Sequence, residues 1–213
     1  VFDKKNQRLP YLDNVIYTVV PDMNAMALRF LKGESDAHEN IRPDDYERFK
    51  AEADKGKFQL LELGFGLERG FLWFNLNTNL NAKTSKPIVD PKKSKWFREQ
   101  KFCQAISHAI DRDSIVKSVY AGRAQPNFGF VSPGNKKWHN AGVHQYPYDK
   151  AKALALLAEL GIKDRKGNGI LEDADGNKIE FVLNTNAGNS VREKMSVLIQ
   201  DDLKKLGITL VYQ

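Results

Sequence analysis

The sequence predicts an α/β fold, because runs rich in β-branched and aromatic residues alternate with amphipathic helical segments along the chain. Of the 213 residues, 41% are hydrophobic, which is enough for a sizeable core in one large or two small domains. No run approaches the roughly 18 consecutive apolar residues of a membrane-spanning helix. We therefore expect a globular chain.

The first third of the chain predicts one strand followed by two helices. The run NVIYTVV at 14–20 is typical of a strand, and Pro21 ends it. Asp22 is a favourable N-cap for a helix that ends near Gly33, where a C-terminal glycine belongs. Pro43 occupies a favoured first-turn position and opens the second helix.

Two strand-like runs follow, at 57–63 and 70–77, and glycines separate them. They predict a hairpin or a glycine-hinged pair of strands. The polar tract 78–95 contains two prolines and predicts a loop, so the composition changes just after Asn77.

The rest of the chain predicts helices, one long loop and two further strands. Asp111 and Gly207 are read as an N-cap and a C-terminal glycine. The expected elements are helices at 96–110, 112–120 and 149–160, a Gly/Pro/Asn-rich loop at 123–147, a strand at 179–185, a helix at 190–206 and a strand at 208–213.

The basic charge and the single cysteine favour no special chemistry. The net charge of +6 comes from Lys and Arg spread along the chain, with KKSK at 92–95 as the one cluster, so a solvated basic surface is favoured over a nucleic-acid site. Cys103 has apolar helical neighbours, and His108 at five residues' distance points away from it on a helix. A packed thiol is therefore favoured over a nucleophile.

Two segments could in principle bind metal. Residues 164–175, DRKGNGILEDAD, have the length of a calcium loop, but Lys166 falls where an oxygen ligand belongs, so a glycine-rich turn leading into a hairpin is favoured. His139 and His144 with Asp149 are irregularly spaced, which favours surface histidines over a metal site. We expect no metal and no cofactor.

No serine-hydrolase elbow, zinc-protease motif or phosphate-binding loop is present, and no catalytic residue is predicted. Catalytic triads are spatial rather than sequential, so a fragment of a secreted α/β hydrolase stays open as the alternative to a binding protein. A nucleic-acid-binding module is the third hypothesis, which salt-dependent binding to DNA would support.

Five segments, in this order, resemble the oligopeptide/dipeptide class of extracytoplasmic solute-binding proteins of ABC importers, family 5. They are LPYLDNVIYTVVPD with LRFLKGESD, FLWFNLNTN, FREQKFCQAISHAIDRDSIVKSVYAGRAQPNFGFVSP, YPYDKAKALALLAELGI, and IEFVLNTNAGNSVREKMSVLIQDDLKKLGITLVYQ. The resemblance covers nearly the whole chain. The tract 78–95 is longer than the family's link, and Lys101 to Cys103 replace an Arg-centred helix start.

The resemblance implies a periplasmic-binding-protein-like fold of two α/β lobes, of which this chain is an internal fragment. Residues 1–76 would be the C-terminal part of lobe one with its crossing strand, and 77–213 the N-terminal part of lobe two. It implies a periplasmic or extracellular, membrane-associated monomer that is not an enzyme. Its expected partners are a peptide or other small solute and the ABC transporter permease subunits, not nucleic acid.

The resemblance places Trp73 and Asn75 at ligand-facing positions of the crossing strand. Because side chains alternate along a strand, Phe71, Trp73, Asn75 and Asn77 share one face, and Leu72, Phe74 and Leu76 share the core face. The alternative for Trp73 is packing between the lobes.

Asn186 and Asn189 form the second candidate ligand-binding pair. They follow a strand and precede a helix, a place suited to carboxylate or carbonyl groups of a ligand. The alternative for Asn189 is an N-cap. The aromatic residues of the loop 123–147 are expected either to line the cleft or to be buried.

Overall fold

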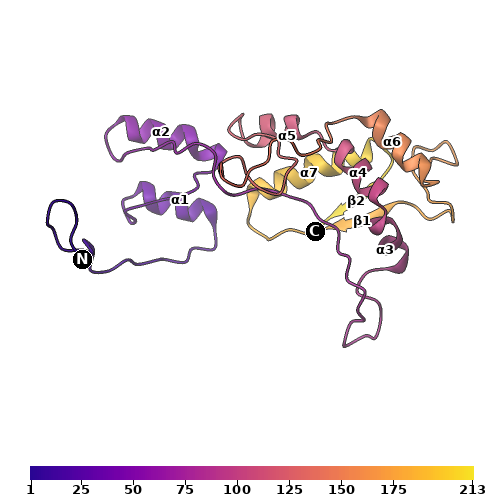
Figure 1. The fold of residues 1–213 in the computed structure, drawn as a ribbon, viewed down its shortest axis with the longest axis horizontal. Helices are drawn as coiled ribbons and strands as arrows, with labels where there is room; N and C mark the ends of the chain where they lie inside the picture. The colour runs from indigo at the N-terminus through magenta and orange to yellow at the C-terminus, as the bar shows by residue number, and fades with distance from the viewer. The chain divides into compact units, whose positions relative to one another are not determined.

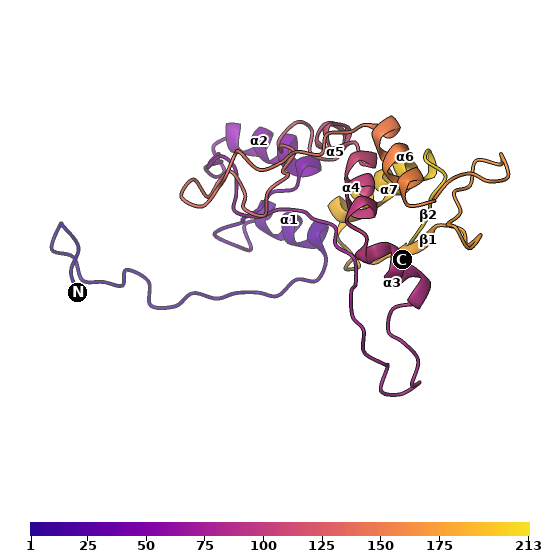
Figure 2. The same ribbon diagram turned by 45° about the vertical axis from the view of Figure 1, so that its right-hand side comes forward.

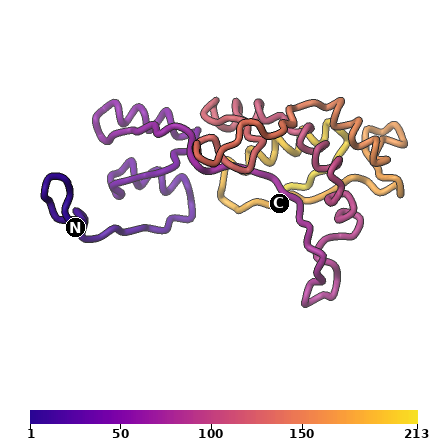
Figure 3. The backbone as a smooth tube through the Cα atoms, viewed as in Figure 1, coloured from indigo at the N-terminus to yellow at the C-terminus, as the bar shows by residue number.

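The computed structural model describes all residues from 1 to 213. Its backbone divides into two compact units, Val1–Glu39 and Asn40–Gln213. Figure 3 traces the chain through both. This division differs from the lobe boundary expected between residues 76 and 77, and that boundary stays a prediction.

The first unit contains one helix, α1 (Met23–Leu31). The Asp22 side chain accepts a hydrogen bond of 2.7 Å from the Ala25 backbone N–H, which confirms the predicted N-cap. Gly33 follows the helix with φ +79°, the left-handed conformation that glycine adopts without strain.

The strand predicted at 14–20 is not formed. The segment is extended but pairs with no neighbouring strand, and Ile16, Tyr17 and Val19 are each at least 86% exposed. High β-propensity alone does not make a strand, because a ladder needs the backbone groups of a second chain segment.

The second unit begins with a short 3-10 turn, η1 (Pro43–Asp45), which leads into α2 (Tyr46–Asp54). A helix was predicted to begin at Pro43, and the proline indeed opens the first turn. Phe49, which belongs to α2, is fully buried, and its ring centroid lies 5.9 Å from that of Phe58.

The strand pair predicted at 57–63 and 70–77 is also absent. Both runs are extended without pairing to each other, so the hairpin prediction was wrong. The loop predicted at 78–95 ends earlier than expected, because α3 (Pro91–Arg98) begins within it. Asp90 caps that helix by accepting from the Lys92 backbone N–H at 2.9 Å, a signal that was present in the sequence.

The single helix predicted at 96–110 is two helices, α3 and α4 (Gln100–Ala109), separated by Glu99 in an extended conformation. Trp96, Phe97 and Phe102 are all buried. On one continuous helix these three side chains would spread over more than half of the circumference, so the break lets both helices face the same core.

The remaining helices match their predicted positions within about two residues. They are α5 (Arg112–Val119), α6 (Lys150–Glu159) and α7 (Ser190–Lys204). Figure 1 shows α7 running beside the two strands, with α4 and α6 above them, and the turned view of Figure 2 keeps these elements together. Asp111 and Asp149 accept backbone hydrogen bonds as the N-caps of α5 and α6.

The sheet consists of two parallel strands, β1 (Glu180–Leu183) and β2 (Thr209–Tyr212), in a register that pairs Glu180 with Thr209 and Leu183 with Tyr212. Helix α7 connects them, so β1, α7 and β2 form a βαβ unit, as the α/β prediction requires.

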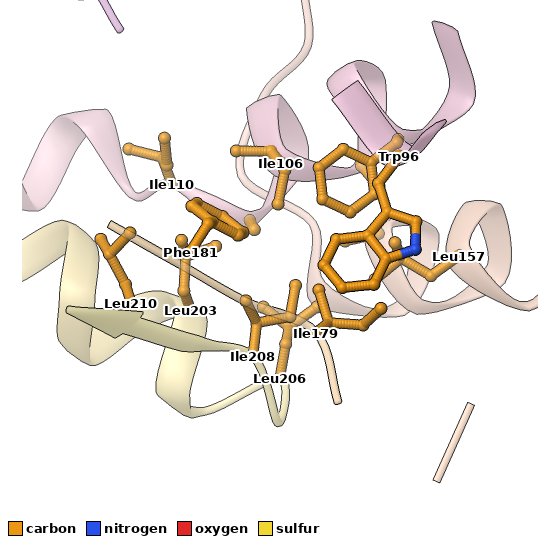
Figure 4. Packing of buried hydrophobic residues seen from close by; sticks show 14 of the residues in the cluster. Trp96, Ile106, Ile110, Leu157, Ile179, Phe181, Leu203, Leu206, Ile208 and Leu210 are labelled. Atoms are coloured by element: carbon orange, nitrogen blue, oxygen red, sulfur yellow. The ribbon is translucent and has the colours of Figure 1, made fainter. Parts of the chain in front are cut away.

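One apolar core lies between this βαβ unit and α3 to α6. Figure 4 shows Trp96, Ile106 and Leu157 from the helices facing Phe181 and Leu210 from the strands. Phe74 packs against this core, with its ring centroid 4.6 Å from that of Phe97. The extended segment that carries the predicted site residues is therefore attached to the core at Phe74.

Candidate solute-binding site

The segment 70–77 presents alternating side chains although it is not a paired strand. Phe71 and Trp73 are exposed, at 61% and 72%, whereas Leu72 and Phe74 are half-buried. The predicted alternation is confirmed at these four positions. It fails at Leu76, which is 48% exposed, because the chain leaves the core after Phe74.

Asn75 is exposed, and its side chain shapes the local backbone. Its Oδ1 accepts a hydrogen bond of 3.0 Å from the Asn77 backbone N–H, and Asn77 repeats this contact with Asn79 at 2.9 Å. These turns orient the side-chain amide of Asn75 without using its N–H donors.

An open groove of about 470 Å³ lies beside Phe71. It is lined by Leu67, Glu68, Arg69, Phe71 and, from the first turn of α7, Arg192. Phe71 also contacts Trp73, with 5.1 Å between the ring centroids. Trp73 itself does not line the groove, and its role in ligand contact stays a prediction.

Arg69 is held by aromatic rings rather than by acids. Its guanidinium carbon lies 4.0 Å from the ring centroid of Phe130 and 5.6 Å from that of Phe71. Stacking of this kind leaves the N–H edge of a guanidinium available. The Nε of Arg69 is buried and has no hydrogen-bond partner in the protein, so this donor is unsatisfied.

Arg192 joins the two predicted asparagines. Its guanidinium donates to Oδ1 of Asn186 at 2.8 Å, and its backbone N–H donates to Oδ1 of Asn189 at 3.1 Å. Asn189 is therefore the N-cap of α7, and the capping alternative is confirmed. Asn186 is exposed and faces the arginine that lines the groove.

The charges around the groove act on Tyr120, whose hydroxyl donates to Sδ of Met195 at 3.6 Å. Burial raises the pKa of Tyr120 above its ordinary value; Arg192 opposes this rise and Glu68 adds to it.

The residues that line the groove carry two guanidinium groups, those of Arg69 and Arg192, and one carboxylate, that of Glu68. Their net charge is positive, which is suited to an anionic group.

Arg69 and Arg192, which line the groove, were not among the predicted site residues. One signal for Arg192 was readable in the sequence: it lies in the first turn of a helix, where the helix dipole disfavours a positive charge. A cation in that position is compensated when it faces an anion, which makes such a residue a candidate for ligand binding.

The loop 123–147 is partly attached to the groove. Ser132 donates from its hydroxyl to the Gly66 carbonyl at 2.5 Å, and Phe130 stacks on Arg69. Gly134 lies so close to the backbone of Phe65 that a Cβ at position 134 would be 2.2 Å from the Phe65 carbonyl oxygen. Trp138, in contrast, is 67% exposed and contacts Lys137, so only part of the loop reaches the site.

The segment 164–175 forms the predicted turn. The Asp164 carboxylate accepts hydrogen bonds from the backbone N–H groups of Lys166, Asn168 and Gly169, and these bonds lower its pKa. Lys163 and Glu172 then form an antiparallel bridge. The Asp164 oxygens that a calcium ion would need are thus directed at the backbone.

The other candidate groups have structural surroundings. His139 Nδ1 lies 3.0 Å from the Val131 carbonyl, and the ring of His144 packs on Tyr146 at 4.6 Å. Burial raises the pKa of the half-buried Cys103 thiol, in agreement with a packed thiol. No three His, Cys, Asp or Glu side chains are grouped so that they could hold a metal ion.

None of the helices combines the length and the apolar composition that crossing a membrane requires.

Two curated relatives match almost the whole chain. The probable ABC transporter-binding protein of Deinococcus radiodurans is 34% identical over 211 residues, which are 98% of this chain and 34% of the relative. The oligopeptide-binding protein AppA of Bacillus subtilis is 33% identical over 207 residues, 96% of this chain and 34% of the relative. The chain thus spans about a third of the length of these relatives.

Two solved structures share the fold. AppA of Bacillus subtilis in complex with a nonapeptide superposes with a TM-score of 0.68 at 32% identity, over 92% of this chain and 34% of that one. The periplasmic binding protein MelB of Agrobacterium fabrum in complex with stachyose superposes with a TM-score of 0.72 at 25% identity, over 99% of this chain and 32% of that one. Both support the predicted fold class.

The family model named bacterial extracellular solute-binding proteins, family 5, middle part, matches residues 2–213. The family predicted by resemblance is therefore confirmed, and a hydrolase fragment finds no support among these relatives, which are transport proteins. The chain belongs to the family 5 bacterial extracellular solute-binding proteins.

Proposed function

We propose that this chain supplies one wall of the binding cleft of an ABC-importer solute-binding protein that captures peptides. The observation that carries the proposal is the pair of guanidinium groups, Arg69 and Arg192, in one groove beside the exposed aromatic rings of Phe71 and Trp73. Peptides offer both a carboxylate and apolar side chains to such a site.

The polar groups of the groove fit the capture of a solute from water. A trapped solute must find partners for its polar atoms, because each unpaired buried group costs about 1–3 kcal/mol. Arg192 offers a guanidinium held by Asn186, and Asn75 offers the N–H edge of its amide, whereas the Nε of Arg69 is buried. Asn189 acts indirectly, by holding the first turn of α7.

The charge of the groove favours a peptide over a neutral sugar. AppA binds a nonapeptide in its complex, and MelB binds stachyose, so relatives of this fold take either class. Two arginines against one glutamate leave a positive charge that stachyose could not neutralise. A peptide carboxylate neutralises it.

The protein acts outside the cytoplasmic membrane, as a monomer and without catalysis, and hands its solute to permease subunits. The family to which the chain belongs supports this location and this role in transport. No cofactor or metal is required for capture by hydrogen bonds and aromatic contacts.

The test uses the protein at its natural length and calorimetric titration with a nonapeptide, in its free-acid and C-terminal amide forms. We expect the amide to bind about 10- to 100-fold more weakly, as the loss of a charge-assisted pair predicts. In Arg192→Gln the difference in affinity between the free-acid and the amide peptide should shrink, because the guanidinium that pairs with the carboxylate is absent.

Lys204→Gln is the matched control, since Lys204 lies in the last turn of the same helix and is exposed. It should keep the natural preference for the free acid. Peptides that fail to bind in either form would exclude a peptide carrier. Unchanged affinity in both Trp73→Ala and Asn75→Ala would remove the segment 70–77 from the site.

A further inference from the structure

Most of the net charge of the chain is concentrated in residues 78–98, which we call the basic segment. Lys and Arg occur throughout the sequence, but outside this segment acidic residues nearly balance them. The basic segment contains six cationic side chains and one carboxylate, a net charge of +5, whereas all 213 residues carry +6. Its cations are Lys83, Lys86, Lys92, Lys93, Lys95 and Arg98.

The first half of the basic segment is a folded hairpin. An antiparallel bridge joins Leu80 to Pro87, and the Asn81 side chain closes the turn by accepting a hydrogen bond of 2.9 Å from the Lys83 backbone N–H. Figures 1 and 2 both show this hairpin, just before α3, projecting away from the other elements of the second unit. The lysines at its end are therefore held away from the core.

The base of the hairpin is fixed to the core. Val89 is 9% exposed and belongs to the apolar core, as do Trp96 and Phe97 of α3. The indole nitrogen of Trp96 also donates to Asp173 at 3.1 Å. The hairpin and α3 thus present their cations from one supported surface.

Carboxylates neutralise few of the α3 cations. Lys95 pairs with Asp175 at 3.4 Å, but both side chains are about two-thirds exposed. Lys92 Nζ donates to the neutral amide of Asn177 at 2.8 Å. The carboxylate within the segment, that of Asp90, accepts from the backbone as the N-cap of α3. The segment therefore keeps most of its positive charge.

The end of the hairpin combines free lysines with exposed aliphatic side chains. Lys83 and Lys86 are exposed and carry no ion pair. Leu80 and Ile88 beside them are 59% and 44% exposed. Lysines next to aliphatic groups are suited to a membrane surface, where the ammonium groups meet anionic lipid headgroups and the aliphatic groups meet the acyl boundary.

The composition of the basic segment favours lipid over other anionic partners. Five of its six cations are lysines, whereas protein interfaces are enriched in arginine and depleted in lysine. Residues 78–95 contain no aromatic side chain on which a nucleobase could stack. Attraction to a charged lipid surface requires only point charges, which lysine supplies.

We propose that the basic segment binds the surface of a membrane that contains anionic lipids. None of its residues lines the groove, so this contact leaves solute binding free. The inference rests on the proposed function in one respect, because delivery to permease subunits brings the protein to a membrane. Attraction along the membrane would keep the protein near the permease between deliveries.

The experiment measures partition into lipid vesicles by co-sedimentation, with the protein at its natural length and free of attached lipid. Vesicles of phosphatidylcholine with about 30% phosphatidylglycerol are compared with pure phosphatidylcholine. We expect binding to the anionic vesicles only, and its loss at about 0.5 M salt. Lys83→Gln combined with Lys86→Gln should lower the partition coefficient about 10- to 30-fold, since each lysine near an anionic surface contributes about 5-fold.

Lys117→Gln combined with Lys204→Gln is the matched control. These lysines are exposed on α5 and α7, and their replacement removes the same charge without touching the basic segment. This double variant should partition as the natural protein does. An equal loss in both double variants would mean that only the net charge of the protein matters, and it would overturn the assignment to the basic segment.

Two other results would overturn the proposal: equal binding to neutral and anionic vesicles, or binding to duplex DNA by a protein that does not bind the anionic vesicles. Calorimetric titration with the nonapeptide separates this inference from the proposed function. The Lys83→Gln, Lys86→Gln protein should bind the peptide as the natural protein does. If the vesicles bind and no peptide binds, the proposed function fails and the membrane contact stands. If the peptide binds and the vesicles do not, the membrane contact fails alone.

Discussion

The indole nitrogen of Trp96 donates a hydrogen bond of 3.1 Å to the carboxylate of Asp173, and this contact fastens α3 to the turn that follows the glycine-rich loop. Asp173 is 6% exposed and also accepts hydrogen bonds from the backbone and side chain of Asn177. Burial opposes ionisation of this carboxyl, but the hydrogen bonds from Asn177 and Trp96 outweigh it, so the pKa of Asp173 is lowered from 3.8.

Asp173→Ala should destabilise the protein by about 2–3 kcal/mol, because it leaves several buried donors without an acceptor. Trp96→Phe, which removes one donor, should cost about 1 kcal/mol. Urea unfolding of the protein at its natural length measures both. Asp175→Ala is the control: Asp175 is exposed and pairs with Lys95 at 3.4 Å, so a loss above about 0.5 kcal/mol there would contradict the assignment to buried hydrogen bonds.

The alternation along 70–77 predicts opposite effects for two neighbouring residues. Phe74→Ala removes a ring that stacks on Phe97 and should cost about 2–4 kcal/mol of unfolding free energy. Trp73→Ala should change stability by less than about 0.5 kcal/mol and weaken solute binding instead, since Trp73 is exposed. Thermal unfolding and calorimetric titration of both variants decide this. Equal losses of stability would show that the indole is a structural residue.

The helices could be predicted from the sequence because their signals are local. Asp22, Asp111 and Asp149 act as N-caps at the predicted positions, and each contact spans three residues or fewer. The strands depended on distant partners. Only β1 and β2, which α7 connects, pair with each other. The runs 14–20 and 57–63 have a similar β-propensity, but no strand pairs with them.

The residues that line the groove could be predicted only in part, for the same reason. The alternation around Trp73 and the cap at Asn189 are periodic or local features. The meeting of Arg69 with Phe130 joins residues 61 positions apart, and that of Arg192 with the groove joins the turn of α7 to the segment 67–71. Neither contact can be predicted from the spacing of residues in the sequence, because both depend on how the loop 123–147 and α7 pack.

Asn186 and Asn189 should be separable by mutation. Asn189→Ala removes the cap of α7 and should cost about 1 kcal/mol of stability. Asn186→Ala should leave stability unchanged and weaken peptide binding, because it frees the Arg192 guanidinium from its fixed position. Urea unfolding and titration with the free-acid nonapeptide measure the two effects. A loss of stability in Asn186→Ala with unchanged affinity would assign Asn186 to the fold.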